Sequence, residues 1–207
     1  MLHPLAELSA LPALRALAVT TPHDAGVRQV AALSARLAYV LTCATLVWGV
    51  LVATGWLHRL TGRHATRSSH LVLATLAIAF GALHAAAFVF LTGATQFSVV
   101  DLTVPFADGL ARHAAGIIGI ELMLAIAVSM LVQRFLPYRR WLWLHRMAYP
   151  AVLLIIVHSL LGAIANGHIE QLWLGGLTVL TPTVVVAVLR FIPAKVLVNA
   201  GLVEEDA

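Results

Sequence analysis

Five long apolar stretches constrain this chain more than any other feature of its sequence. They cover residues 35–57, 70–91, 114–136, 141–164 and 171–192. A helix needs about 20 mostly apolar residues to cross a bilayer. Only a helix satisfies the backbone N–H and C=O groups of an isolated segment inside lipid. The sequence therefore predicts an all-α integral membrane bundle of about five transmembrane helices.

The overall composition agrees with a membrane protein. Charged residues make up 11% of the chain, against about 25% in an ordinary soluble domain, and the mean hydropathy is +0.94. We therefore expect membrane lipid as a partner and no nucleic acid, although the net charge is +4. The single cysteine, Cys43, lies in an apolar run. It forms no internal disulfide and is expected to be a small buried side chain.

Three segments are expected along the chain. Residues 1–34 contain three prolines and are predicted to be irregular or to form a short surface helix. Residues 35–192 form the membrane bundle. Residues 193–207 form a short cytoplasmic tail, so we expect no soluble domain.

The charges of the connecting links predict the orientation. Basic residues lie at the ends of the first, third and fifth apolar stretches or just after them: Arg59, Arg63, Arg67, Arg134, Arg139, Arg140, Arg190 and Lys195. Acidic residues dominate the other two links: Asp101, Asp108 and Glu170. Lysine and arginine concentrate on the cytoplasmic side of membrane proteins. We therefore expect a multi-pass protein of the plasma (inner) membrane, with the N-terminus outside and the C-terminus cytoplasmic. Arg15, Arg28 and Arg36 count against this orientation.

Four histidines interrupt two of the apolar stretches. His70 and His84 are fourteen residues apart, and His145 and His158 are thirteen residues apart. Both stretches follow a basic link, so their helices run in the same direction. The second histidine of each lies about 20 Å beyond the first, at 1.5 Å per residue. This predicts that His70 lies level with His145, and His84 level with His158.

The spacing in the second of these helices needs a bend. Fourteen residues leave two side chains about 40° apart around a helix, but thirteen leave them about 140° apart. Pro150 lies between His145 and His158, and an internal proline kinks a helix. We expect this kink to turn His158 toward His84.

Paired histidines at matched depth are typical of a cofactor site. Imidazole nitrogen is an axial ligand of haem iron, and helical bundles hold cofactors between facing helices. A single intramembrane histidine is as readily a hydrogen-bonded packing residue or part of a proton path. Two matched pairs favour two non-covalent b-type haems, with all four histidines as iron ligands. The other histidines are expected at the surface: His3, His23, His58, His64, His113 and His168. Of these, His113 and His168 are also considered as contacts for an external acceptor.

At these residues the chain resembles the ferric reductase-like transmembrane domain family. The family includes the membrane parts of NADPH oxidases and ferric reductases, and the haem-bearing membrane partner of periplasmic methionine sulfoxide reductase. The two histidine pairs fit its pattern, and "YRRWLWLHRMAY", residues 138–149, is similar to the entry to its second histidine helix. The resemblance covers roughly residues 35–192. It implies electron transfer through two stacked bis-histidine haems, from a cytoplasmic-side donor to an outer-face acceptor.

Three departures from the family limit what it implies. The family core usually has six helices with the N-terminus inside, whereas five are expected here. No G-x-G-x-x-G motif follows a strand pattern, so the donor is expected to be a separate flavoprotein or a quinol. The position one turn after His84, where some oxidases have a further histidine, is Phe88. Superoxide production is therefore not supported.

Other residues are candidates to assist the haems. Arg67, Arg139 and Arg146 lie near the first layer and are candidate partners for haem propionates, or simply topology markers. Phe80 lies one turn before His84 and is a candidate to fill the gap between the haems, or an ordinary packing aromatic. The chain would then be the electron-transfer subunit of an oxidoreductase, with its enzymatic role left open.

Two alternatives stay open. One is a proton or metal-ion transporter that uses the histidines as relays, although Glu121 is the single acid within the predicted helices. The other is a non-catalytic membrane subunit of a larger respiratory complex. The donor, the terminal acceptor, the direction of electron flow and the oligomeric state are not encoded in any motif found here.

Overall fold

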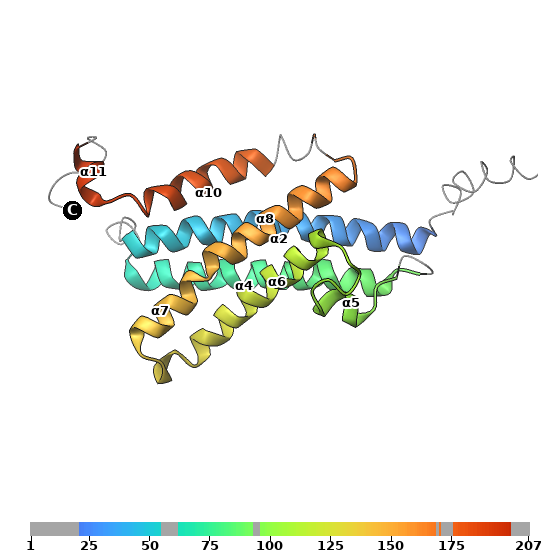
Figure 1. The fold of residues 1–207 in the computed structure, drawn as a ribbon, viewed down its shortest axis with the longest axis horizontal. Helices are drawn as coiled ribbons and strands as arrows, with labels where there is room; N and C mark the ends of the chain where they lie inside the picture. The colour runs from blue at the N-terminus through green and yellow to red at the C-terminus, as the bar shows by residue number, and fades with distance from the viewer. Residues whose placement is uncertain (1–20, 55–61, 93–95, 169, 171–175, 200–207) are drawn as a thin grey trace, which may run out of the picture.

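The computed structural model describes residues 21–54, 62–92, 96–168, 170 and 176–199. It is 84% helical and contains no strand within the described residues, so the predicted all-α fold is confirmed. The helices, shown in Figure 1, are α2 (Pro22–Thr54), α4 (Arg63–Ala87), η1 (Phe88–Phe90), α5 (Val99–Thr103), α6 (Ala111–Leu131), η3 (Gln133–Phe135), α7 (Tyr138–Arg146), α8 (Ala148–Ala165), α10 (Leu177–Leu189) and α11 (Ala194–Asn199).

Four of the helical segments are long and apolar enough to cross a membrane. They are Pro22–Thr54, His64–Phe90, Ala111–Leu131 and Tyr138–Ala165. A fifth apolar helix, α10, has 13 described residues, and the predicted start of its span at residues 171–175 lies outside the described residues. The chain is therefore a multi-pass helical membrane protein.

The first helix begins earlier than the sequence predicted. Residues 22–34 were expected to be irregular or to form a separate surface helix, but they form the first turns of the 33-residue helix α2. Pro22 occupies the first helical position, where its missing N–H has no helical partner. The Thr21 hydroxyl accepts a hydrogen bond from the Asp24 N–H at 3.1 Å and caps the helix. These local signals begin the helix before the apolar stretch does.

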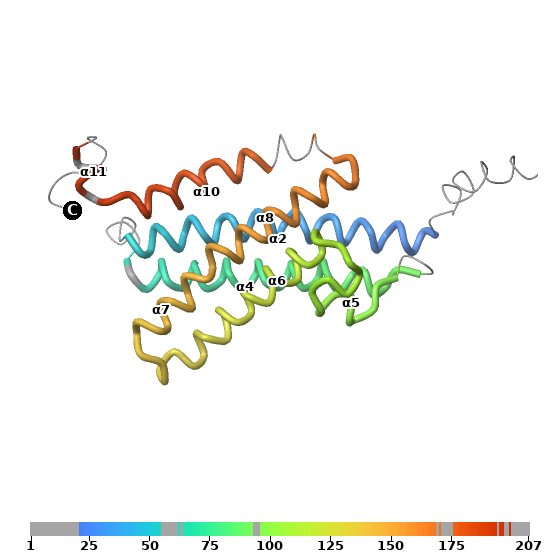
Figure 2. Tube along the Cα trace, in the orientation of Figure 1, coloured from blue at the N-terminus to red at the C-terminus, as the bar shows by residue number. Residues whose placement is uncertain are grey.

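The bundle is built from two antiparallel helix pairs. In the tube view of Figure 2, α4 lies along α2. The helix α6 pairs with α8, and α10 packs against α2. Small side chains line the buried face of α2, among them Ala31, Ser34 and Cys43, and they let neighbouring backbones approach closely. Cys43 is 1% exposed, which confirms that it is buried.

The outer surface of the bundle is apolar. Leu71 and Val72 on α4 and Leu153 on α8 are each at least half exposed. Large aliphatic side chains on the outside, and small ones inside, suit a bundle surrounded by lipid rather than by water.

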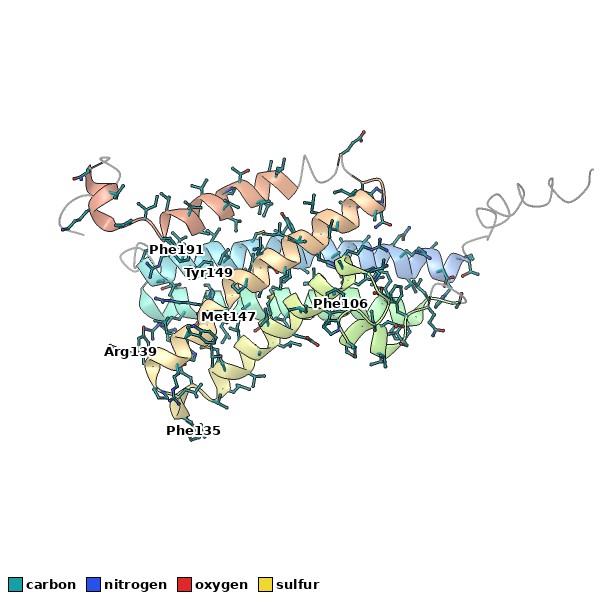
Figure 3. The ribbon with its side chains drawn as sticks, viewed as in Figure 1. Phe106, Phe135, Arg139, Met147, Tyr149 and Phe191 are labelled. Carbon is teal, nitrogen blue, oxygen red and sulfur yellow. The ribbon has the colours of Figure 1, made fainter. Side chains whose placement is uncertain are left out.

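The two ends of the bundle differ in charge. Arg139 and Phe135 lie at one end, and Phe106 lies toward the other, as labelled in Figure 3. We call the first the basic end, because it also carries Arg134 and Arg140. The opposite end, where α5 lies, carries Asp101 and Asp108, and we call it the α5 end. The packing of Tyr149 against Phe191, with ring centroids 5.1 Å apart, holds α8 to the residues after α10 near the basic end.

Candidate functional site

The four intramembrane histidines form two pairs that join α4 to α7 and α8. In the first pair, His70 and His145 have ring centroids 6.1 Å apart and ring planes at 66°. In the second pair, His84 and His158 have centroids 6.1 Å apart and ring planes at 69°. The structure thus brings together the same partners that helix direction and depth predicted.

The expected break lies between the two histidines of the later helix. The helix α7 ends at Arg146 and α8 begins at Ala148, with Met147 between them. Pro150 has no N–H to donate to the Arg146 carbonyl, and its ring clashes with that carbonyl in a regular helix. At Met147 the N–H donates to the Leu144 carbonyl, three residues earlier, at 3.0 Å, which makes a tighter turn than the four-residue spacing of an α-helix. The break lets His158 face His84 despite the thirteen-residue spacing.

Both histidines of the second pair are held by backbone carbonyls. Nδ1 of His84 lies 2.9 Å from the Ala31 carbonyl oxygen, and Nδ1 of His158 lies 2.7 Å from the Arg112 carbonyl oxygen. A carbonyl oxygen only accepts, so each Nδ1 carries the hydrogen. Each neutral ring then has its lone pair on Nε2, the arrangement found in histidines that ligate metals.

The first pair has a different environment. Nδ1 of His70 and Nδ1 of His145 are buried, and neither has a hydrogen-bond partner in the described part of the chain. The ring of Trp141 stacks on His145 with centroids 5.2 Å apart and planes at 21°, and its Nε1 is also buried without a partner. Buried unpaired polar atoms are rare in folded proteins. Three of them in adjoining rings distinguish this cluster from ordinary packing.

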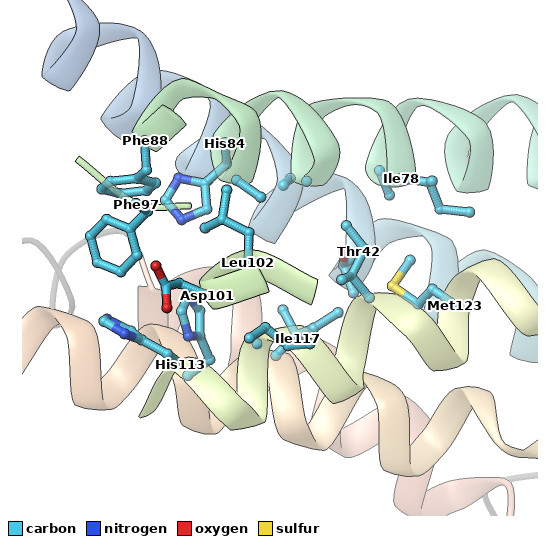
Figure 4. Close-up of a pocket in the computed structure, with 18 residues that line it drawn as sticks. Thr42, Ile78, His84, Phe88, Phe97, Asp101, Leu102, His113, Ile117 and Met123 are labelled. Carbon is cyan, nitrogen blue, oxygen red and sulfur yellow. The ribbon is translucent and has the colours of Figure 1, made fainter. Parts of the chain in front are cut away.

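A cavity of about 160 Å³ adjoins the second pair. Figure 4 shows it bounded by His84 and Phe88 on one side and by His113 and Ile117 on the other. Its remaining walls include several small residues: Ala38, Ala77, Gly81, Ala85 and Gly116. The mostly apolar lining is typical of cofactor sites, although the cavity is smaller than the roughly 300–1,000 Å³ of such sites.

These features fit haem better than a bare metal ion. A metal bound by two imidazoles at about 2 Å each, with each ring centroid about 1.1 Å behind its nitrogen, has centroids about 6.2 Å apart. Both pairs show 6.1 Å. The described residues contain no group of three or more His, Cys, Asp or Glu side chains that could hold one ion, whereas a zinc site uses three or four protein ligands. Haem supplies its own equatorial ligands and needs only the two axial ones.

The residues predicted to assist the haems are exposed or only half-buried. Arg67, Arg139 and Arg146 are exposed near the first pair, and none forms an ion pair with another described residue. Phe80 is half-buried on α4 and is not among the residues that line the cavity. Glu121 is exposed on α6.

The sequence did not predict the ring contacts that join three residues at the α5 end. Phe88 packs edge-on against His84 with centroids 5.2 Å apart, and contacts of 5.5 Å continue from Phe88 to Phe97 and from Phe97 to His113. Their positions on separate elements gave no sequence signal, except that Phe88 follows His84 by one turn. His23, His64 and His168 are exposed as predicted, and His3 and His58 lie outside the described residues.

The predicted surface position of His113 is corrected by the structure. Its side chain is 22% exposed and lines the cavity. Its Nδ1 contacts the Asp108 carboxylate, and its Nε2 accepts a hydrogen bond from Arg112 Nε at 3.1 Å. Burial opposes ionisation of Asp108, but hydrogen bonds from the Leu110 N–H and from His113 outweigh it, so the pKa of Asp108 lies below its usual value.

Comparison of the chain with protein-family models, with curated proteins and with solved structures gives no match. The resemblance to the ferric reductase-like family therefore rests on the two histidine pairs and the residues around them.

Proposed function

We propose that this chain transfers electrons across a membrane and binds two b-type haems, one at each histidine pair. One observation carries the proposal: the rings of the second pair lie at the spacing of two imidazoles on one iron, and both Nδ1 atoms are committed to backbone carbonyls. Both Nε2 atoms are then free to bind the iron. A haem held by both histidines of a pair would supply single-electron exchange at that position.

The depth of the pairs supports a path across the bilayer. His70 and His84 are fourteen residues apart on one continuous helix, which separates the pairs by about 21 Å along α4. The hydrocarbon core of a bilayer is about 30 Å thick. On this proposal one pair serves each leaflet.

We place the donor at the basic end. Arg139 and Arg140 on α7, and Arg134 just before it, are exposed at this end. From the positive-inside tendency we infer that this end is cytoplasmic. A separate flavoprotein with an acidic docking surface would be steered to these charges. A membrane quinol is the other donor considered, and the acceptor lies beyond the α5 end on the outer face.

Electron transfer through reconstituted protein tests this proposal. The haem-loaded chain is placed in liposomes that enclose a membrane-impermeant electron acceptor, and the donor is added outside. Reduction by a soluble reduced flavoprotein is compared with reduction by a reduced quinol over a series of ionic strengths. We expect reduction of the enclosed acceptor, with a flavoprotein rate that falls as salt rises.

The possible results separate the competing functions. Reduction by quinol that is insensitive to salt moves the donor from the cytoplasm to the lipid and leaves transmembrane transfer standing. Haem-loaded liposomes that reduce no enclosed acceptor contradict the proposal. Movement of protons or metal ions through haem-free protein would support the transporter instead.

A further inference from the structure

Two glycines lie directly beneath the rings of two of these histidines. A Cβ atom added at Gly116 on α6 would lie 2.7 Å from Nδ1, 2.9 Å from Cε1 and 3.0 Å from Cγ of His158. A Cβ atom added at Gly49 on α2 would lie 3.0 Å from Cε1 of His70. Contacts below about 3 Å between such atoms force one of them to move. The His158 ring could not keep its position if Gly116 carried a side chain, and the His70 ring would have to give by a few tenths of an ångström if Gly49 did.

The contact at Gly116 is coupled to the hydrogen bond of His158. Arg112, whose carbonyl oxygen accepts from Nδ1 at 2.7 Å, lies four residues before Gly116. Residues four apart share one face of a helix. The imidazole therefore lies against this face of α6, and its Nδ1 is close both to the Arg112 carbonyl and to Gly116. A methyl group at Gly116 would push the ring off this face and break the bond to the Arg112 carbonyl.

Other glycines of the chain show that this contact is specific. Gly119, one turn further along α6, meets Ile155 Cγ1 at 2.9 Å and the Ala151 carbonyl at 3.3 Å, so it brings two helices together without touching a histidine. Gly162 on α8 has nothing within 4 Å of the added Cβ. Close approach to a histidine ring is therefore not a general property of glycines in this bundle.

We infer that Gly116 and Gly49 are positioning residues for haem ligation. Each glycine leaves a space against its own helix that one histidine ring of a pair occupies, and we call this space the seat of that ring. This inference rests on the proposed function. At Gly116 the seat fixes which nitrogen of His158 faces the iron, because Nδ1 is held by α6 and only Nε2 faces away. At Gly49 the seat limits the orientation of the His70 ring, whose buried Nδ1 has no hydrogen-bond partner among the described residues.

The expected effects are local to one haem each. Removal of groups that orient a metal-bound histidine typically weakens binding about 10- to 100-fold. Gly116→Ala should weaken haem binding at the second pair by about this factor and spare the first pair. Gly49→Ala should weaken binding at the first pair and spare the second, with a smaller effect because its closest contact is 3.0 Å rather than 2.7 Å. Gly162→Ala is the matched control and should change neither.

The test measures wild-type protein and the three variants after haem-replete expression. Haem per chain gives the occupancy, the low-spin ferric EPR signals identify which haem has changed its ligand geometry, and thermal unfolding reports the fold. The inference is overturned if Gly116→Ala leaves both EPR signals and both occupancies unchanged. Equal loss of both haems in Gly116→Ala and in Gly49→Ala, with lowered melting temperatures, would also overturn it and would indicate a packing role.

Two further results are informative. If Gly116→Ala does not accumulate, the milder Gly49→Ala variant decides, and it overturns the inference if both haems keep their wild-type signals. Wild-type protein without haem would overturn the proposed function and this inference together. Two haems in the wild type that are insensitive to both glycines would overturn this inference alone.

Discussion

The second pair should behave as a single unit when its histidines are replaced by leucine, one at a time and together. The 6.1 Å spacing of the rings suits two imidazoles on one iron, so under the proposed function the loss of either ligand should remove the same haem. Each of His84→Leu and His158→Leu, and also the double variant, should therefore lower the haem content from about two to about one per chain. Leucine is chosen because it fills the site without a polar atom.

The cross-pair combination provides the contrast. His70 and His158 belong to different pairs, whose separation along α4 of about 21 Å exceeds the roughly 7–10 Å over which mutations usually couple. The combined His70→Leu and His158→Leu variant should therefore lose both haems. His64→Leu, an exposed histidine on the same helix, is the control and should keep about two haems per chain.

Haem content is measured as the pyridine haemochrome per chain, with reduced-minus-oxidised spectra to show which haem remains. The reasoning is refuted if His70→Leu and His158→Leu each abolish the same haem. It is equally refuted if the double variant within the second pair loses both haems while each single variant loses one.

Three further results are expected. The haem at the second pair should have the lower midpoint potential, because donation from both Nδ1 atoms to carbonyls raises the basicity of its ligands; a potentiometric titration that finds equal or reversed potentials contradicts this. Hydrogen bonds from Ser98 hold the pKa of Asp101 below its usual value, so the cap of α5 should persist above pH about 4 and be lost as pH falls through the lowered pKa of the folded protein. Amide protection factors in α5 should fall as the pH is lowered, and Asp101→Asn should remove this pH dependence. Protection in the wild type that stays constant from about pH 6 to about pH 3 would count against the prediction. Trp48→Phe removes a 2.9 Å hydrogen bond to the carbonyl of buried Thr66 and should lower the free energy of unfolding in detergent by about 1 kcal/mol, whereas unchanged stability would show that water replaces the bond.

Much of the bundle was predictable because the relevant signals are local. Apolar length determines which segments cross the bilayer, and helix direction follows from the alternation of basic and acidic links. Together these two signals predicted which histidines lie at equal depth. Pro150 also predicted the break, although the helix is interrupted at Met147, about one turn earlier, next to Arg146, whose carbonyl the proline ring would clash with in a regular helix.

The remaining features depend on how helices rotate against one another, which apolar composition does not encode. The seat of His158 on Gly116 needs the rotation of α6 as well as that of α8. His113 was predicted at the surface because it lies next to an acidic link, yet α5 and the α6 terminus fold around it and place it at the cavity. The early start of α2 was missed because Thr21 and Asp24 cap a helix that begins before the apolar stretch.

The visible absorption spectrum of purified wild-type protein, expressed with ample haem, tests the central claim most directly. The dithionite-reduced spectrum should be that of a low-spin b-type haem, and the quantified haem should be about two per chain, because two histidine pairs each have the spacing for one iron. Folded, monodisperse protein that takes up no haem would contradict the claim that these pairs are haem ligands.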